Sequence, residues 1–154
     1  MVEICREAGL STGAVYTWFG SKQAIIDEMA TRGLRRHREL RSEMADAEAA
    51  RRAIDGYLSS LQAVMDDGVR ARMNAHLLSE AACGTEAGDA LRRIITSGAA
   101  LLTSAMSSLA PHAEDVRERA LVLHATALGA VVQRILEPGG EAASLELARR
   151  LIAY

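Results

Sequence analysis

The feature that most constrains the fold of this chain is the spacing of its apolar residues, which recurs every three or four positions. This spacing puts apolar side chains on one face of an α-helix, whereas a half-buried strand needs strict alternation. Pro occurs only twice, and Ala and Leu are abundant, which favours helix over strand. We therefore expect an all-α protein.

Short segments containing Gly, Pro or Asp-Gly divide this pattern into eight predicted helices. Ser11, Ser21 and Thr85 stand where a side chain can cap the helix that follows. Gly9 suits the left-handed residue that often ends a helix. The predicted helices span residues 1–8, 12–19, 22–45, 48–65, 69–83, 86–109, 113–136 and 142–153.

The third predicted helix carries both apolar residues and an Arg-rich stretch, GLRRHREL. Its apolar spacing places Ile25, Met29, Leu40 and Met44 inside the protein. His37 lies between arginines, so we expect it on a solvated, charged surface.

Composition narrows the class of protein. A net charge of -2 does not suit a nucleic-acid coat protein, although it permits a locally basic DNA reader. Cys5 and Cys83 lie too far apart for a metal-ligand motif, and we expect both as small buried apolar side chains in a reducing compartment. No apolar run approaches the roughly 20 residues of a membrane span, and MVEICREAG does not resemble a signal peptide. A cytoplasmic protein without membrane contact is expected.

Residues 4–22, ICREAGLSTGAVYTWFGSK, carry the most specific pattern. A short helix, a tight Gly-Leu-Ser turn and a second short helix are the layout of a helix-turn-helix. On the second helix, Val15 and Phe19 are four residues apart and would face the core. The opposite face has small and hydroxyl-bearing side chains, which suit close approach to phosphates and base edges. This face comprises Thr12, Gly13, Tyr16 and Thr17.

Within this segment, AGLSTGAVYTWFGSKQAI (residues 8–25) resembles the signature of the TetR/AcrR family of transcriptional regulators. The shared features are an Ala-Gly-aliphatic-Ser turn, a short recognition helix ending in aromatic-x-aromatic-Phe, and a Ser-Lys pair that opens the next helix. The resemblance implies that Thr12, Gly13 and Thr17 lie nearest the base edges. It also implies phosphate contacts by Ser11, Thr12, Tyr16, Trp18 and Lys22.

Two departures from the family pattern affect the predicted head. Trp18 stands where the family usually has Tyr, so an indole N–H with a different reach replaces a phenolic hydroxyl. The family also has a preceding helix and a basic arm, which have no counterpart here. We therefore expect Ile4, Val15 and Phe19 to be partly exposed and DNA affinity to suffer. The chain would be a fragment, a shortened form, or one whose start is misassigned. The alternative is an ordinary helical hairpin with an exposed aromatic cluster, which requires several independent positions to match by accident.

Beyond the head, the resemblance is one of architecture. It implies a DNA-binding head with its connecting helix at residues 1–45 and a ligand-binding and dimerisation domain at 46–154. Middle helices would enclose an effector pocket, predicted to involve Tyr57, Met65, Met73, His76, Leu77, Glu80, Cys83, Leu102 and Met106. The last two helices would pair with their copies through Leu121, Leu128, Val132, Ile135, Leu145, Ala148, Leu151 and Ile152. Ordinary core packing in a monomer explains the same apolar residues.

Enzyme and metal chemistry find little support in the sequence. His76 and Glu80 are four residues apart on one helix face, but without a third ligand they are better explained as a structural or solvated pair. No nucleophile-base set, phosphate loop or cofactor motif is recognisable. We therefore expect that the chain is not an enzyme and binds no metal or cofactor.

The resemblance implies a transcriptional regulator that releases a palindromic operator when a small apolar or amphipathic effector binds. By the family's usual mode it would be a repressor. Its partners would be double-stranded DNA, the effector and a second copy of the chain. The rival reading is a helical homodimeric module that binds a ligand or protein and has lost operator binding.

Overall fold

A computed structural model describes residues 5–6, 9–137 and 145 of the chain. Over these residues there are six helices and no strands, so the predicted all-α class is confirmed. The helices are α2 (Thr12–Phe19), α3 (Lys22–Ser42), α4 (Ala47–Asp66), α5 (Gly68–Ala82), α6 (Glu86–Leu109) and α7 (Val116–Leu136). Of the predicted helix 1–8 only Cys5 and Arg6 are described, both helical. Apart from Leu145, the predicted helix 142–153 lies outside the described residues.

Local capping chemistry sets the starts of these helices. The side chains of Ser11, Ser21 and Thr85 each accept a hydrogen bond from a backbone N–H three residues later, at 3.1, 3.0 and 3.2 Å. Such bonds satisfy first-turn donors that have no partner within the helix. All three predicted caps are therefore confirmed. Asp67 alone separates α4 from α5, and its carboxylate caps α5.

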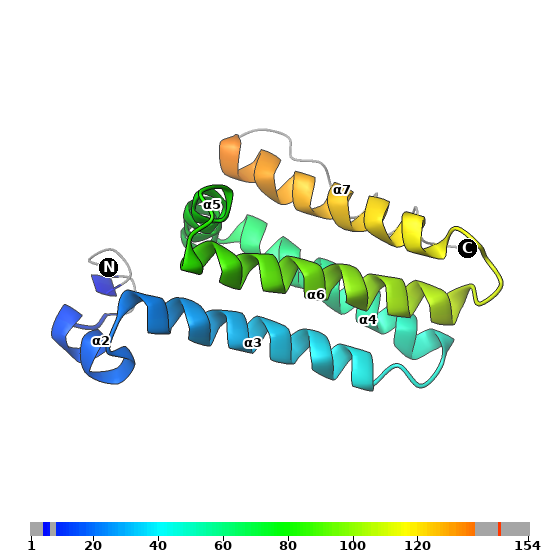
Figure 1. The fold of residues 1–154 in the computed structure, drawn as a ribbon, viewed down its shortest axis with the longest axis horizontal. Coiled ribbons are helices and arrows are strands. Elements are labelled where there is room, and N and C mark those ends of the chain that lie inside the picture. Colours follow the sequence, from blue (N-terminus) through cyan, green and yellow to red (C-terminus); the bar gives the residue numbers. More distant parts are fainter. Residues whose placement is uncertain (1–4, 7–8, 138–144, 146–154) are drawn as a thin grey trace.

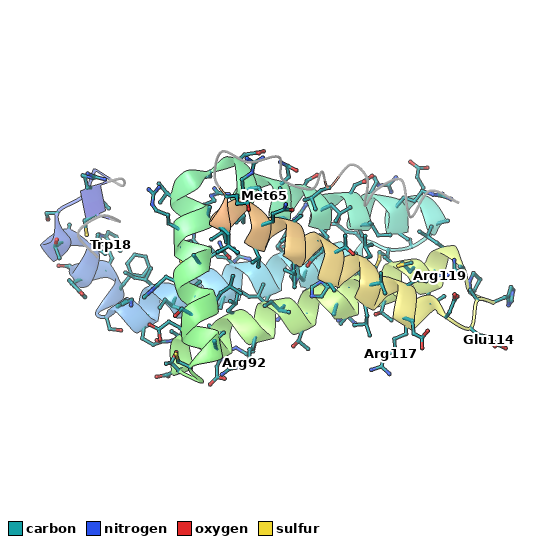
Figure 2. The ribbon with its side chains drawn as sticks, turned by 90° about the horizontal axis from the view of Figure 1, so that it is seen from above. Trp18, Met65, Arg92, Glu114, Arg117 and Arg119 are labelled. Carbon is teal, nitrogen blue, oxygen red and sulfur yellow. The ribbon has the colours of Figure 1, made fainter. Side chains whose placement is uncertain are left out.

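Helix α6 is central to the arrangement, because it packs against α3, α4, α5 and α7. Helices α3, α4, α6 and α7 run roughly along the long axis of the molecule, and α5 crosses them (Figures 1 and 2). Helix α2 projects beyond the bundle at one end (Figure 1), where α3 is the one described helix that it contacts. The described part of the molecule thus consists of a five-helix body with a short helix at the tip.

The core forms two apolar clusters. The larger one joins α4, α6 and α7 and includes the fully buried Leu58, Leu101 and Leu102, with Leu145 packed among them. The smaller one joins α3, α5 and the start of α6. Its buried members are Ile26, Ala30, Leu77, Ala87, Ala90 and Leu91.

The buried face of α3 differs from the prediction. Ile26, Ala30, His37 and Leu40 are the buried residues, while the predicted Ile25, Met29 and Met44 are half-buried. Residues 30, 37 and 40 share one helix face, and this face packs on α6. The contact with α6, rather than the polarity of neighbouring residues, therefore decides which side chains of α3 are buried.

Two predictions of side-chain exposure were wrong, one for a histidine and one for a cysteine. His37, expected at the surface, is only 6% exposed, because the α3 face that carries it packs against the body. Cys83, expected to be buried, is exposed at the end of α5, whereas Cys5 is buried as expected.

Two glycines of α6 permit close approach by its neighbours. A Cβ at Gly88 would lie 2.3 Å from the Cα of Ala81, where α5 turns into α6. A Cβ at Gly98 would lie 2.8 Å from the ring of Tyr57 on α4. Distances this short are incompatible with a methyl group unless α5 or Tyr57 moves.

We predict that Gly88→Ala lowers the free energy of unfolding by about 1–3 kcal/mol, because its methyl group would overlap the α5 backbone. Gly129→Ala is the matched control, since nothing lies within 4 Å of a Cβ at this position of α7. That change should raise stability by roughly 0.5–1 kcal/mol through the helix preference of Ala. Urea unfolding followed by circular dichroism measures both, and equal stabilities would contradict the prediction.

Candidate functional site

The tip of the molecule presents the residues predicted to contact DNA. All seven are exposed, on α2, its cap and the first residue of α3: Ser11, Thr12, Gly13, Tyr16, Thr17, Trp18 and Lys22. Figure 2 shows Trp18 at this end of the molecule, and its side chain is 84% exposed. Val15 is buried, as its predicted core-facing position implies and not partly exposed as the shortened head implied. Phe19, also predicted to face the core, is 36% exposed, as the shortened head implied. Ile4 lies outside the described residues.

A tight turn fixes the direction in which α2 begins. Gly9 has a φ of +64°, a left-handed conformation that favours glycine. Its N–H donates to the carbonyl of Arg6 at 3.2 Å, and the N–H of Leu10 donates to the carbonyl of Cys5 at 2.9 Å. This pair of bonds is the Schellman pattern of a helix end. Ser11 then caps α2 directly, so the turn is short and fully hydrogen-bonded.

The two helix starts at the tip, in the first turns of α2 and α3, lack acidic side chains, although the carboxylate of Glu80 lies 3.5 Å from His76, which contacts Lys22. The N-terminus of a helix carries partial positive charge and unsatisfied N–H groups, which attract phosphate. The hydroxyl of Thr17 donates to the carbonyl of Gly13 at 2.9 Å and so is held along the helix.

Lys22 is engaged by the body of the protein. Its Nζ lies 3.1 Å from Nε2 of His76 on α5, and lysine can only donate in this contact. The same Nε2 lies 3.5 Å from Oε1 of Glu80. His76 can therefore accept from Lys22 when neutral or donate to Glu80 when that nitrogen is protonated. This contact joins the start of α3 to α5.

A cavity of about 260 Å³ lies in the body, among α3, α4, α5, α6 and α7. It is partly open and mostly apolar, and its lining includes residues of both core clusters. The lining comprises Gly33, Arg36, His37, Tyr57, Ser60, Leu61, Val64, Asn74, Leu78, Leu91, Ile94, Ile95, Leu128, Val131 and Val132.

One wall of the cavity carries a buried polar group. The hydroxyl of Tyr57 lies 2.8 Å from Nδ1 of His124, and the rings of His37 and Tyr57 are 5.6 Å apart. Nδ1 of His37 has no hydrogen-bond partner within the described part of the chain. Gly98 of α6 leaves room for this group, since a Cβ there would lie 2.9 Å from the Tyr57 hydroxyl.

Burial keeps these three side chains uncharged near neutral pH. Burial and then the nearby His124 lower the pKa of His37. Burial likewise lowers the pKa of His124, although the backbone of Ile95 acts in the opposite direction. Burial raises the pKa of Tyr57. The cavity wall is therefore polar but neutral.

The predicted pocket and the cavity share one residue, Tyr57. Of the other predicted residues, Met65, Leu77, Leu102 and Met106 are buried in the clusters. The remainder belong to α5 and its end: Met73 and Glu80 are half-buried, and His76 and Cys83 are exposed. The sequence reasoning missed His37, Asn74 and the α6 residues. The one signal for His37 was its three-residue spacing from Leu40.

The residues predicted for a dimer interface differ in exposure. Leu121 and Val132 of α7 are exposed, and Leu128 and Ile135 are half-buried. Leu128 and Val132 also line the cavity, and Leu145 is buried in its own chain. Ala148, Leu151 and Ile152 lie outside the described residues.

The described residues also bear on metal binding and membrane crossing. In the part of the chain that the structure describes, no group of three His, Cys, Asp or Glu side chains could hold a metal ion. One described helix, α7, is long and apolar enough to cross a membrane by length and composition alone, a test that core helices of soluble proteins also pass. In this structure α7 packs against α4, α5 and α6.

Comparison with known proteins leaves the family open. No protein family, curated protein or solved structure matches this chain.

The neutral histidines predict how stability depends on pH. In the unfolded chain histidine has a pKa of about 6.5, and burial lowers the pKa of His37 and His124 in the folded chain. Below pH 6.5 the unfolded chain therefore binds more protons. Stability should be complete above about pH 6.5 and fall as the pH drops through the lowered values, by up to about 1.4 kcal/mol per pH unit for each histidine.

Urea unfolding at pH 8, 7, 6 and 5 measures this dependence. His37→Phe should weaken it, because the ring is kept and the titrating nitrogens are lost. The exposed His112→Phe serves as the control and should leave the dependence unchanged. An unaltered dependence in His37→Phe would contradict the assignment.

Proposed function

We propose that this chain is a ligand-responsive, DNA-binding transcriptional regulator that acts as a repressor. The observation that carries the proposal is the tip, where seven residues of the TetR-like pattern are all solvent-exposed on one short helix, its cap and the start of the next. In a structural hairpin nothing would require Tyr16 and Trp18 to remain exposed on a helix that projects from the bundle.

The dimensions and chemistry of the tip suit duplex DNA. An α-helix such as α2 is about 10–12 Å in diameter with its side chains, and the major groove is about 12 Å wide, so the groove admits it. The small Thr12 and Gly13 at its start would permit close approach to base edges. Tyr16, Trp18 and Lys22 supply donors for phosphates on either side.

Two helices connect the tip with the cavity. Helix α3 carries Lys22 at its start and lines the cavity with His37. Helix α5 carries His76, which holds Lys22, and lines the cavity with Asn74. An effector in the cavity would touch both helices. It would release the operator if it bound better to a conformation with displaced tips, since equal affinity for both conformations shifts nothing.

A dimer would complete the proposed mechanism. Two recognition helices set about 34 Å apart match a palindromic operator. Several large apolar side chains of α7 are exposed and available for such an interface: Leu121, Val122, Val132 and Leu136. The rival function, a ligand- or protein-binding module without operator binding, differs from this proposal in showing no DNA affinity.

We predict that the purified chain shifts duplex DNA from upstream of its own coding sequence, with an affinity that falls steeply as salt rises. Tyr16→Ala should weaken binding by about tenfold or more, as expected for loss of one good contact. Lys22→Ala should reduce the slope of log affinity against log salt by about one for each head.

Arg52→Ala is the matched control for charge, because Arg52 is an exposed residue of α4 paired with Glu48. It should change neither the affinity nor the slope. Absence of any shift at low salt, or equal effects of Arg52→Ala and Lys22→Ala, would favour the rival function.

His76→Ala tests the connection between tip and body. In the present conformation His76 competes with phosphate for Lys22. Removing it should raise DNA affinity by roughly two- to tenfold, the value of one net hydrogen bond. His112→Ala should have no effect. Unchanged or weaker binding in His76→Ala would show that the contact does not restrain Lys22.

A further inference from the structure

We infer that the cavity binds a neutral, largely apolar molecule of about ten non-hydrogen atoms that carries one hydroxyl group, held by His37. An alkylphenol or a cyclic alcohol of that size belongs to this class. The inference defines the effector of the same site, and it rests on the proposed function only for its consequence for DNA binding.

The size of the molecule follows from the volume. A protein cavity of about 150 Å³ accommodates benzene, so one of about 260 Å³ matches roughly ten non-hydrogen atoms. Most of the lining is aliphatic, as in Leu61, Val64 and Ile94. Such a lining favours binding of an apolar molecule over a sugar or a peptide.

The polar contact follows from His37. Its side chain is 6% exposed, it lines the cavity, and its Nδ1 has no hydrogen-bond partner within the described residues. A buried nitrogen without a partner is costly, and a ligand that supplies one removes this cost. The hydroxyl of Tyr57 is already bonded to Nδ1 of His124. Nε2 of His124 also has no hydrogen-bond partner within the described residues, but His124 does not line the cavity, so His37 is the histidine that a ligand would meet.

The absence of net charge follows from the surroundings. His37 and His124 are held neutral by burial, so neither offers a cation to a buried carboxylate. Arg36 also lines the cavity, but its side chain is more than half exposed and lies 3.9 Å from Glu39. An ion placed deep in the cavity would lose its hydration without gaining a counter-ion. A hydroxyl both donates and accepts, and therefore bonds to either neutral form of His37.

Isothermal titration of the full chain with three matched probes tests the inference. The probes are 4-propylphenol, propylbenzene, which lacks the hydroxyl, and 4-methylbenzoate, an anion with as many non-hydrogen atoms as the phenol. We expect 4-propylphenol to bind most tightly. Propylbenzene should bind about tenfold more weakly, as for one lost hydrogen bond, and the benzoate more weakly still.

Variants of His37 identify the group responsible. His37→Phe should abolish the preference for 4-propylphenol over propylbenzene, while His37→Gln, which keeps a polar group, should retain part of it. The exposed His112→Phe should leave it unchanged. Equal binding of the two neutral probes by the original chain would overturn the inference, as would tightest binding of the benzoate or no binding of any probe.

This outcome is separable from the outcome for DNA. Selective binding of 4-propylphenol by a chain that shifts no DNA would retain the ligand site and remove the regulator. Binding of DNA by a chain that binds none of the probes would retain the DNA-binding function and overturn the inferred ligand class.

Discussion

Much of this structure depends on two positions of α6 that have no side chain. At Gly88 the backbone of α5 approaches so closely that a methyl group would overlap it, and at Gly98 the ring of Tyr57 lies against the helix. The first approach places α5 across the long helices, where Asn74 and Leu78 form part of the cavity wall. The second allows Tyr57 and His124 to form a buried pair. The shape of the cavity and its polar wall both follow from these close approaches.

Features that depend on a few adjacent residues were predictable from the sequence. The bounds of α2 and α6 agree with the prediction, because a Ser or Thr cap and a glycine or proline near the other end define each helix locally. The exposure of the seven tip residues also agrees, since α2 contacts α3 alone among the described helices and Val15 occupies its buried side.

Features that depend on how helices cross were not predictable in this way. The buried face of α3 is set by α6, so Ile26 rather than Ile25 points inward. His37 was assigned to the surface because its neighbours Arg36 and Arg38 are charged. Adjacent residues on a helix point about 100° apart, however, so the polarity of neighbours says little about a side chain's own environment. The crossing of α5 likewise could not be deduced from apolar spacing. Because the cavity depends on this crossing, its lining residues could not be predicted either.

Helix α3 can turn a small tilt near the cavity into a larger movement of the tip. Lys22 and His37 are fifteen positions apart on this one unbroken helix, which corresponds to about 22 Å along its axis. A tilt of α3 by about 5° around the cavity would therefore carry its first turn through roughly 2 Å. Helix α2 contacts no other described helix and would travel with it. The same tilt would move Ile26 and Ala30 against α5 and α6, so the smaller core cluster would have to repack for the tip to move by most of a hydrogen bond's length.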